Sequence, residues 1–109
     1  MIVNKPSIFI YAHNPDKDCL REVCAGIEEE GVFYEVFERD YADLDTLAHI
    51  AANDSMMGSG VGICNNSVAM QMKGIPKGKN VQQFDIPTLE DCRRIGSNSA
   101  RIIKKMPLK

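Results

Sequence analysis

Polar side chains that could do chemistry follow the apolar run Val61-Gly-Ile-Cys64, where Asn65-Asn66-Ser67 add two amides and a hydroxyl to the thiol. If a helix begins at Ser67, its first backbone N–H groups would favour an anion such as a phosphate. Capping of that helix by Asn66 or Ser67 explains the same residues without a ligand. The pair Gly60-x-Gly62 lacks the third glycine of a dinucleotide site and comes before the turn rather than in it.

Catalysis through a nucleophile or a metal finds little support in the spacing. Cys64 with His13 as its base is the one pair that could be drawn, but a cysteine inside Val-Gly-Ile-Cys is typical of a small buried side chain. Cys19 and Cys24 are not spaced as a CxxC motif, and no ligand pattern joins His13 to His49. The sequence therefore favours structural thiols and a chain without catalysis of its own.

The acidic run Glu28-Glu29-Glu30 stands at the end of the first predicted helix, where negative charge opposes the helix dipole. Two interpretations stay open. The run is a solvated helix face, or one of its carboxylates reaches a cation or a metal that a partner protein holds.

The elements that must position these groups alternate between strand and helix. Apolar residues at three- and four-residue spacing predict helices, with Asn14 and Gly31 at the ends of the first and Thr88 at the start of the last, while short β-favouring runs predict strands. This order predicts an α/β fold with a parallel or mostly parallel sheet of about four strands flanked by helices. The predicted strands are 7–12, 32–37, 61–64 and 81–84, and the predicted helices are 15–31, 44–52, 67–72 and 88–103.

Composition excludes several classes of protein. The 109 residues suit a single domain spanning 1–109, and 44% hydrophobic with 26% charged residues is typical of a globular protein. A net charge of -2 argues against a nucleic-acid partner. Apolar runs fall short of the roughly 20 residues that cross a bilayer, and the start of the chain lacks the pattern of a signal peptide. We expect a cytoplasmic protein without a membrane partner.

Four segments in order resemble the small subunit of the diol and glycerol dehydratase reactivating factors. They are Arg21-Glu-Val-Cys-Ala-Gly-Ile-Glu-Glu-Glu-Gly-Val32, Gly60-Val-Gly-Ile-Cys64, Ile75-Pro76 and Arg94-Ile-Gly-Ser-Asn-Ser-Ala-Arg-Ile-Ile-Lys-Lys-Met-Pro-Leu108. The resemblance implies a fold similar to that of the dehydratase medium (beta) subunit. It also implies a non-catalytic part of a chaperone-like factor, whose large ATPase subunit is its partner, in the cytoplasm and associated with a bacterial microcompartment.

The resemblance further implies subunit exchange with an adenosylcobalamin-dependent dehydratase, which releases damaged cobalamin. In the family a glutamate of the acidic run helps to ligate Mg²⁺ in the large subunit. Counting back from Gly31, Glu29 matches it, with Glu28 and Glu30 as neighbours. The chain alone is expected to bind no cofactor. The expected partner-binding residues are Glu28, Glu29, Glu30, Asn65, Asn66 and Ser67.

Two other functions compete with this one. The first is a free-standing small-molecule or phosphate-binding domain with its site at Asn65–Ser67. The second is a cobalamin-binding domain, which the residues around His13 disfavour: Tyr11 stands where the Asp-x-His-x-x-Gly motif needs aspartate, and Asp16 where it needs glycine.

Overall fold

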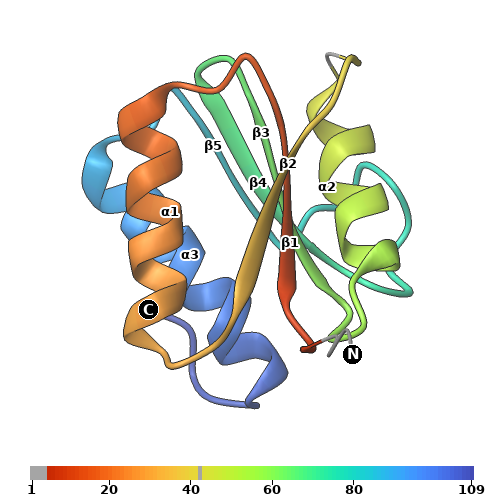
Figure 1. Ribbon diagram of the computed structural model, residues 1–109, viewed down its shortest axis with the longest axis vertical. Helices are drawn as coiled ribbons and strands as arrows, with labels where there is room; N and C mark the ends of the chain where they lie inside the picture. The colour runs from red at the N-terminus through yellow and green to blue at the C-terminus, as the bar shows by residue number, and fades with distance from the viewer. Residues whose placement is uncertain (1–4, 42) are drawn as a thin grey trace.

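The computed structural model describes residues 5–41 and 43–109, which fold into one sheet with helices on both of its faces (Figure 1). Helices α1 and α3 cover one face, and α2 covers the other. The elements in chain order are β1 (Ile8–His13), α1 (Lys17–Glu29), β2 (Tyr34–Glu38), α2 (Leu44–Asp54), β3 (Ser59–Cys64), β4 (Ser67–Met72), β5 (Gln82–Asp85) and α3 (Leu89–Ile103).

The sheet is mixed and has five strands, in the order β2-β1-β3-β4-β5. β1 runs parallel to β2 and β3, whereas β4 is antiparallel to both β3 and β5. The α/β class is therefore confirmed, but the predicted parallel or mostly parallel sheet of about four strands is wrong, since two of the four strand pairs are antiparallel. The difference arises at 67–72, where a short helix was predicted and β4 is found.

Strand β4 was missed because it is buried on both faces and lacks the apolar–polar alternation of a half-exposed strand. Val68, Ala69, Met70 and even Gln71 are fully buried. Cys64 pairs with Ser67, so a two-residue turn at Asn65-Asn66 joins β3 to β4. Asn65 has φ of 52°, a left-handed conformation that asparagine tolerates better than most residues.

Helices α1 and α3 pack backbone against backbone. A Cβ added at Gly26 would lie 2.2 Å from the carbonyl oxygen of Arg93, and one at Gly96 would lie 2.1 Å from that of Val23. Ser97 also donates to the carbonyl of Gly26 across the same contact (3.2 Å). Glycine at both positions is thus what allows the two helices to approach so closely.

Helix α2 packs against the sheet through glycines of the strand rather than of the helix. Here the glycines are in β3, where a Cβ at Gly60 would lie 2.2 Å from the nitrogen of Ala52 and one at Gly62 would lie 2.6 Å from the nitrogen of Ala48. The helix supplies small side chains, since Ala48, Ala51 and Ala52 are fully buried. The glycines flanking Val61 therefore serve packing, not a phosphate.

Of the three residues predicted to end or begin helices, two are confirmed. Gly31 follows α1 with φ of 72°, and Thr88 forms a capping box with Asp91 at the start of α3, both as predicted. The predicted cap Asn14 is wrong. Asp16 caps α1 instead, and its carboxylate accepts a hydrogen bond from the backbone N–H of Cys19 (3.0 Å).

The larger core cluster lies between the sheet and the α1–α3 pair, and includes Ile8, Ile10, Ile27, Ile63 and Ile95. At one end of this core the sulfur of Cys19 is 2.6 Å from that of Cys92, and both thiols are free. Burial raises the pKa of both thiols, so they stay protonated at neutral pH. The prediction of structural cysteines agrees with this environment.

The segment after α3 folds back on that helix. Buried Asn98 accepts a hydrogen bond from the backbone N–H of Lys109 (2.7 Å) and donates to the carbonyl of the same residue (3.3 Å). Arg101 donates to the carbonyl of Pro107 (3.0 Å). Asn98 thus gives a structural reason for the Gly-x-Asn sequence that opens at Gly96.

Candidate functional site

The acidic run at the end of α1 lies beside α3, and each of its carboxylates already has a partner in the chain. Glu28 accepts a hydrogen bond from the hydroxyl of Tyr34 (2.7 Å). That bond, with some burial, raises the pKa of Tyr34. Glu28 is exposed.

Glu30 is the most enclosed of the three glutamates, with its side chain 8% exposed. Its Oε2 accepts from Arg101 Nε at 3.1 Å and lies 3.8 Å from Lys109 Nζ. Lys104 donates to its backbone carbonyl (2.8 Å). These cations from α3 and the following segment offset the unfavourable placement of acidic residues at the C-terminal end of α1.

Glu29, like Glu28 and in contrast to Glu30, is exposed. Its side chain is 44% exposed, and it forms an ion pair with Arg93 of α3. Arg93 also holds Glu22 at 3.0 Å, so the guanidinium keeps an acidic partner if Glu29 turns away. Glu29 can therefore turn toward another molecule while Arg93 keeps its contact with Glu22, whereas Glu30 would have to leave an enclosed position.

The second predicted site, Asn65–Ser67, is a hairpin turn and not the start of a helix. The amide of Asn14 donates to Asn65 Oδ1 (2.9 Å), the backbone N–H of Asp16 donates to the carbonyl of Asn65 (3.2 Å), and Ser67 donates to Asp85 (2.9 Å). The expected row of free N–H groups is absent from this turn. The nearby start of α1 is capped by the carboxylate of Asp16, which repels an anion.

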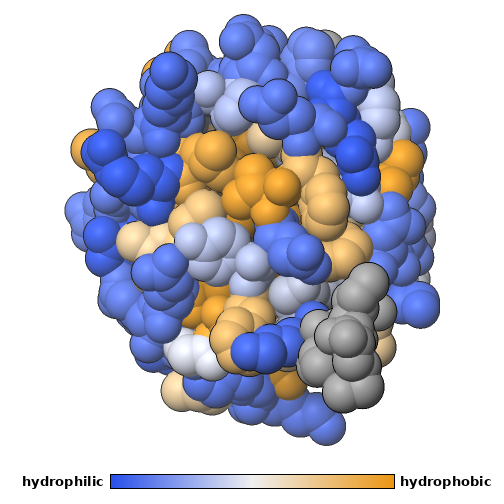
Figure 2. Space-filling view, in the orientation of Figure 1, coloured by the Kyte–Doolittle hydropathy of each residue, from blue (hydrophilic) through white to orange (hydrophobic). Residues whose placement is uncertain are grey.

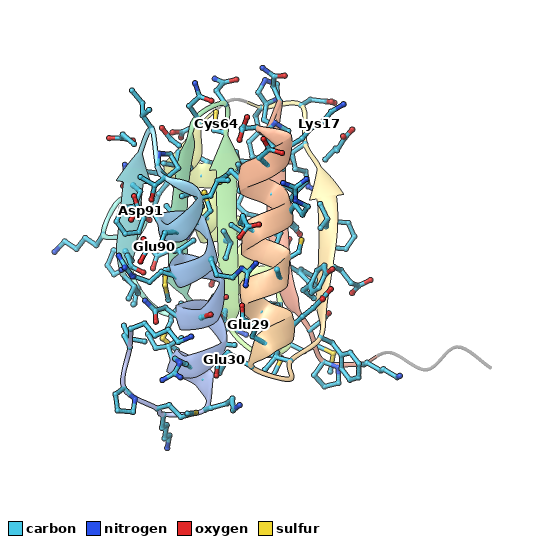
Figure 3. The ribbon with its side chains drawn as sticks, turned by 90° about the vertical axis from the view of Figure 1, so that its left-hand side faces the viewer. Lys17, Glu29, Glu30, Cys64, Glu90 and Asp91 are labelled. Carbon is cyan, nitrogen blue, oxygen red and sulfur yellow. The ribbon has the colours of Figure 1, made fainter. Side chains whose placement is uncertain are left out.

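The structure separates the two groups of predicted partner-binding residues. Cys64, which precedes the turn, lies at the same end of the molecule as Lys17 at the start of α1, while Glu29 and Glu30 lie at the other end (Figure 3). The acidic run and the turn thus stand at opposite ends of α1. A single compact partner site cannot include both.

Cys64 and His13 are neighbours across β1 and β3, but they do not form an activated pair. The Nδ1 of His13 lies 2.9 Å from the carbonyl of Arg39. Burial raises the pKa of the Cys64 thiol, which opposes formation of a thiolate nucleophile. The geometry agrees with the interpretation of Cys64 as a packed side chain.

In the part of the chain that the structure describes, no three His, Cys, Asp or Glu side chains gather as a metal site would require. Helices long and apolar enough to cross a bilayer are likewise absent from the described residues.

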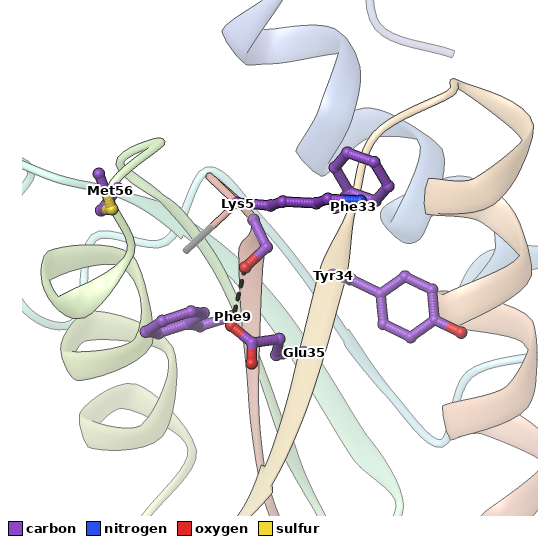
Figure 4. Close-up of a pocket in the computed structure, with 7 residues that line it drawn as sticks. Lys5, Phe9, Phe33, Tyr34, Glu35 and Met56 are labelled. Carbon is purple, nitrogen blue, oxygen red and sulfur yellow. Dashed lines mark hydrogen bonds between the residues drawn. The ribbon is translucent and has the colours of Figure 1, made fainter. Parts of the chain in front are cut away.

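Sequence reasoning missed a surface around β2. A pocket of about 490 Å³ lies at the start of β1 and β2 (Figure 4). There Lys5 Nζ stands 4.7 Å from the ring centre of Phe33, and Ser7 donates to Glu35 (3.0 Å). Phe33 and Met56 are 57% and 74% exposed. The aromatic run Val32-Phe-Tyr-Glu-Val-Phe37 was the available signal, since too many of its side chains are apolar for an exposed edge.

Comparison with known proteins identifies the protein family. Residues 5–109 match the dehydratase medium subunit family, and the chain belongs to that family.

Within known proteins, the chain is 30% identical over 105 residues to the propanediol dehydratase-reactivating factor small subunit of Citrobacter freundii, covering 95% of this chain and 90% of the relative. It is 28% identical over 107 residues to the protein of the same description from Salmonella typhimurium, again covering 95% and 90%. The resemblance inferred from the sequence is therefore confirmed.

Solved structures agree with the fold. A glycerol dehydratase reactivase superposes with a TM-score of 0.89 at 22% identity, over 96% of this chain and 97% of the other. A diol dehydratase-reactivating factor complexed with ADP and Mg²⁺ superposes with a TM-score of 0.88 at 25% identity, over 97% and 99%.

Proposed function

We propose that the chain is the small subunit of a reactivating factor for an adenosylcobalamin-dependent diol or glycerol dehydratase. In this role it binds a large ATPase subunit and trades places with a dehydratase subunit, so that damaged cobalamin is released. The observation that carries the proposal is the similarity to a reactivating-factor small subunit along 95% of the chain. The match to a dehydratase subunit family supports mimicry of a dehydratase subunit.

The surface chemistry is compatible with a subunit that works by docking. Exchange requires an interface of intermediate strength, because each ~1.4 kcal/mol changes the dissociation constant about tenfold. Exposed charged groups such as Glu29 and Arg93 fit an interface that must also be released, since they remain well solvated when the partner leaves.

We propose that Glu29 donates one carboxylate to Mg²⁺ in the large subunit. A single exposed carboxylate fits a metal completed by a partner, because Mg²⁺ in proteins takes few protein carboxylates and keeps other oxygen ligands. Glu30 fits poorly, as its oxygens face Arg101 and Lys109 in a nearly closed position. The ADP and Mg²⁺ bound to a solved relative support the presence of such a metal.

The test is co-purification with the large subunit and titration of the complex with Mg²⁺. We expect the wild-type chain to associate with a large ATPase and to show no ATPase activity alone. Glu29→Gln should weaken the association and its Mg²⁺ dependence. Glu28→Gln is the matched control, because a glutamine oxygen still accepts from Tyr34. Equal weakening by both variants would refute the role of Glu29, and failure to bind any large subunit would refute the function.

The structure gives little support to the competing phosphate-binding function. The helix start it required is a hairpin turn, and the small pocket beside Asn66, about 180 Å³, is lined by acidic Asp16. Thermal shift with inorganic phosphate is the direct comparison, and we expect no shift.

A further inference from the structure

Strand β2 forms one edge of the sheet, and within the described residues no strand lies on its outer side. It crosses the front of the molecule between α1 and α2 (Figure 1). Figure 2 shows hydrophobic side chains gathered in the middle of this face, with hydrophilic residues around them. Phe33 is 57% and Val36 39% exposed. An edge with exposed apolar residues and without proline or lysine can pair with another strand, and its two exposed charges, Glu35 and Glu38, then decide which strand fits.

The backbone groups that face outward can be assigned from the pairing with β1. The carbonyl of Phe33 accepts from Ile8 (2.9 Å) and the N–H of Arg39 donates to Ala12 (2.8 Å), so odd-numbered residues of β2 point toward β1. Because these groups alternate along a strand, Tyr34, Val36 and Glu38 direct their N–H and C=O groups away from the sheet.

The side chains of this edge are complementary to themselves. In an antiparallel pair with a twofold axis at Val36, Tyr34 stands opposite Glu38, Glu35 opposite Phe37 and Phe33 opposite Arg39. Every outward N–H of these residues then meets an outward C=O. No carboxylate stands directly opposite a carboxylate, and Glu35 lies diagonal to Arg39 on one side and to Glu35 of the other copy on the other side. Arg39 already stacks on aromatic rings, at 4.2 Å from the ring centre of Tyr11.

Each neighbouring register fails one of these two criteria. An axis at Glu35 sets that carboxylate against its own copy, which is destabilising. An axis at Phe37 sets Glu35 opposite Arg39 of the other copy, but it leaves the outward backbone groups of Tyr34 opposite Asp40, beyond the end of β2. The charges and the backbone therefore select one register.

We propose that β2 is a homodimer interface, at which a second copy of this chain pairs edge to edge through an antiparallel β2–β2 ladder centred on Val36. The pairing would join two five-stranded sheets into one and cover Phe33 and Val36. The interface is separate from the acidic end of α1 and does not depend on the proposed function.

Sedimentation velocity and light scattering across a concentration series test the proposal on the full chain. We expect a concentration-dependent dimer in the wild type. Val36→Glu should abolish it, because two carboxylates would meet at the twofold axis. Ile86→Glu is the matched control, since Ile86 is 82% exposed and follows β5 at the other edge. Circular dichroism checks that both variants remain folded.

Cross-linking supplies an independent measurement. Val36→Cys should form an intermolecular disulfide under mild oxidation, because residues at the axis lie within the ~7 Å between Cα atoms that a disulfide can bridge. Glu38→Cys should not, as each copy of Glu38 faces Tyr34. A wild-type chain that stays monomeric, or a dimer that Val36→Glu leaves intact, would overturn the proposal. So would a monomer whose β2 edge binds only a different protein.

Discussion

The two faces of the sheet are closed in different ways. On one face, glycines in α1 and α3 bring two helices together, and ion pairs from Arg93 and Arg101 join them at the surface. On the other face, glycines in β3 bring α2 onto the strand, and the space beside it is filled by aromatic rings. Phe37 lies 5.0 Å from Phe9 and 5.6 Å from Tyr11 between ring centres.

The two layers therefore carry different kinds of surface. The α1–α3 layer is closely packed at its backbone contact and presents charges at its surface, which suits recognition that salt and metal can modulate. The α2 layer leaves β2 partly uncovered and presents aromatic side chains, which suits contact with another protein. The predictions below test that division.

The largest effect is expected from Gly96→Ala. In an ordinary exposed helix this change is stabilising by about 1 kcal/mol. Here the new Cβ would lie 2.1 Å from the carbonyl of Val23, so the helices must separate. We expect a loss of at least about 3 kcal/mol in the free energy of unfolding, measured by urea denaturation.

Glu90→Ala on the exposed face of α3 is the control for that experiment, and it should change stability by less than about 0.5 kcal/mol. A neutral or stabilising Gly96→Ala would show that the two helices do not depend on backbone contact.

Gly60→Ala should act on the other face, with a smaller effect. The new Cβ would lie 2.2 Å from Ala52 N, but α2 packs against a strand and an open aromatic side, so it can shift as a unit. We expect a loss of about 1–3 kcal/mol. Hydrogen exchange should increase in α2 and stay unchanged in α1 and α3. Faster exchange in all three helices would mean that the layers are not independent.

Arg93→Gln should lower stability by less than about 1 kcal/mol, because its ion pairs with Glu22 and Glu29 are partly exposed to solvent and screened. The measurement is thermal unfolding at low and high salt, with the difference between variant and wild type shrinking at high salt. A loss of several kcal/mol would show that the surface ion pairs, and not the backbone contact at the glycines, hold α1 and α3 together.

The smallest effect on stability at neutral pH is expected from two tyrosines, Tyr11 on the α2 side of the sheet and Tyr34 on the α1–α3 side. Tyr11 donates to Asp54 at the end of α2 (2.5 Å), and Tyr34 donates to Glu28 of α1 (2.7 Å). The pKa of both phenols is raised above the ordinary 10.0, for Tyr11 by burial and then by Asp54, and for Tyr34 by Glu28 and then by burial.

Because the folded state binds these protons more tightly, the stabilisation is complete below about pH 10 and is lost as pH rises through the folded-state pKa values. Tyr11→Phe and Tyr34→Phe should therefore each flatten the fall in stability above pH 10, measured by urea denaturation at several pH values. An unchanged slope in either variant would contradict its hydrogen bond.

The elements with a single buried face were predictable from the sequence. The stripe of α1 and the capping residues of α3 depend on local spacing, so the pattern located them. Strand β4 was not predictable in this way, because a strand buried on both faces shows no alternation of apolar and polar residues. The sequence did hold a cue for a strand at 67–72: only Asn65-Asn66 separate this run from β3, and a two-residue link of this kind is typical of a β-hairpin.

The candidate site shows the same limit. The sequence located the acidic run, but it could not show that Arg101 and Lys109 enclose Glu30 while Glu29 keeps one shared partner, because these contacts join residues about 70 positions apart. The exposure of the β2 edge likewise depends on strand order, which single-sequence patterns do not determine.

The tether between Asn98 and Lys109 has a practical consequence for labelling this molecule. A fluorophore on the side chain of Lys109 would sit beside Glu30, the neighbour of Glu29 in the sequence. A dye on exposed Lys79, in the connector between β4 and β5, would sit toward the opposite side of the sheet from β2. That position leaves both surfaces open for binding assays.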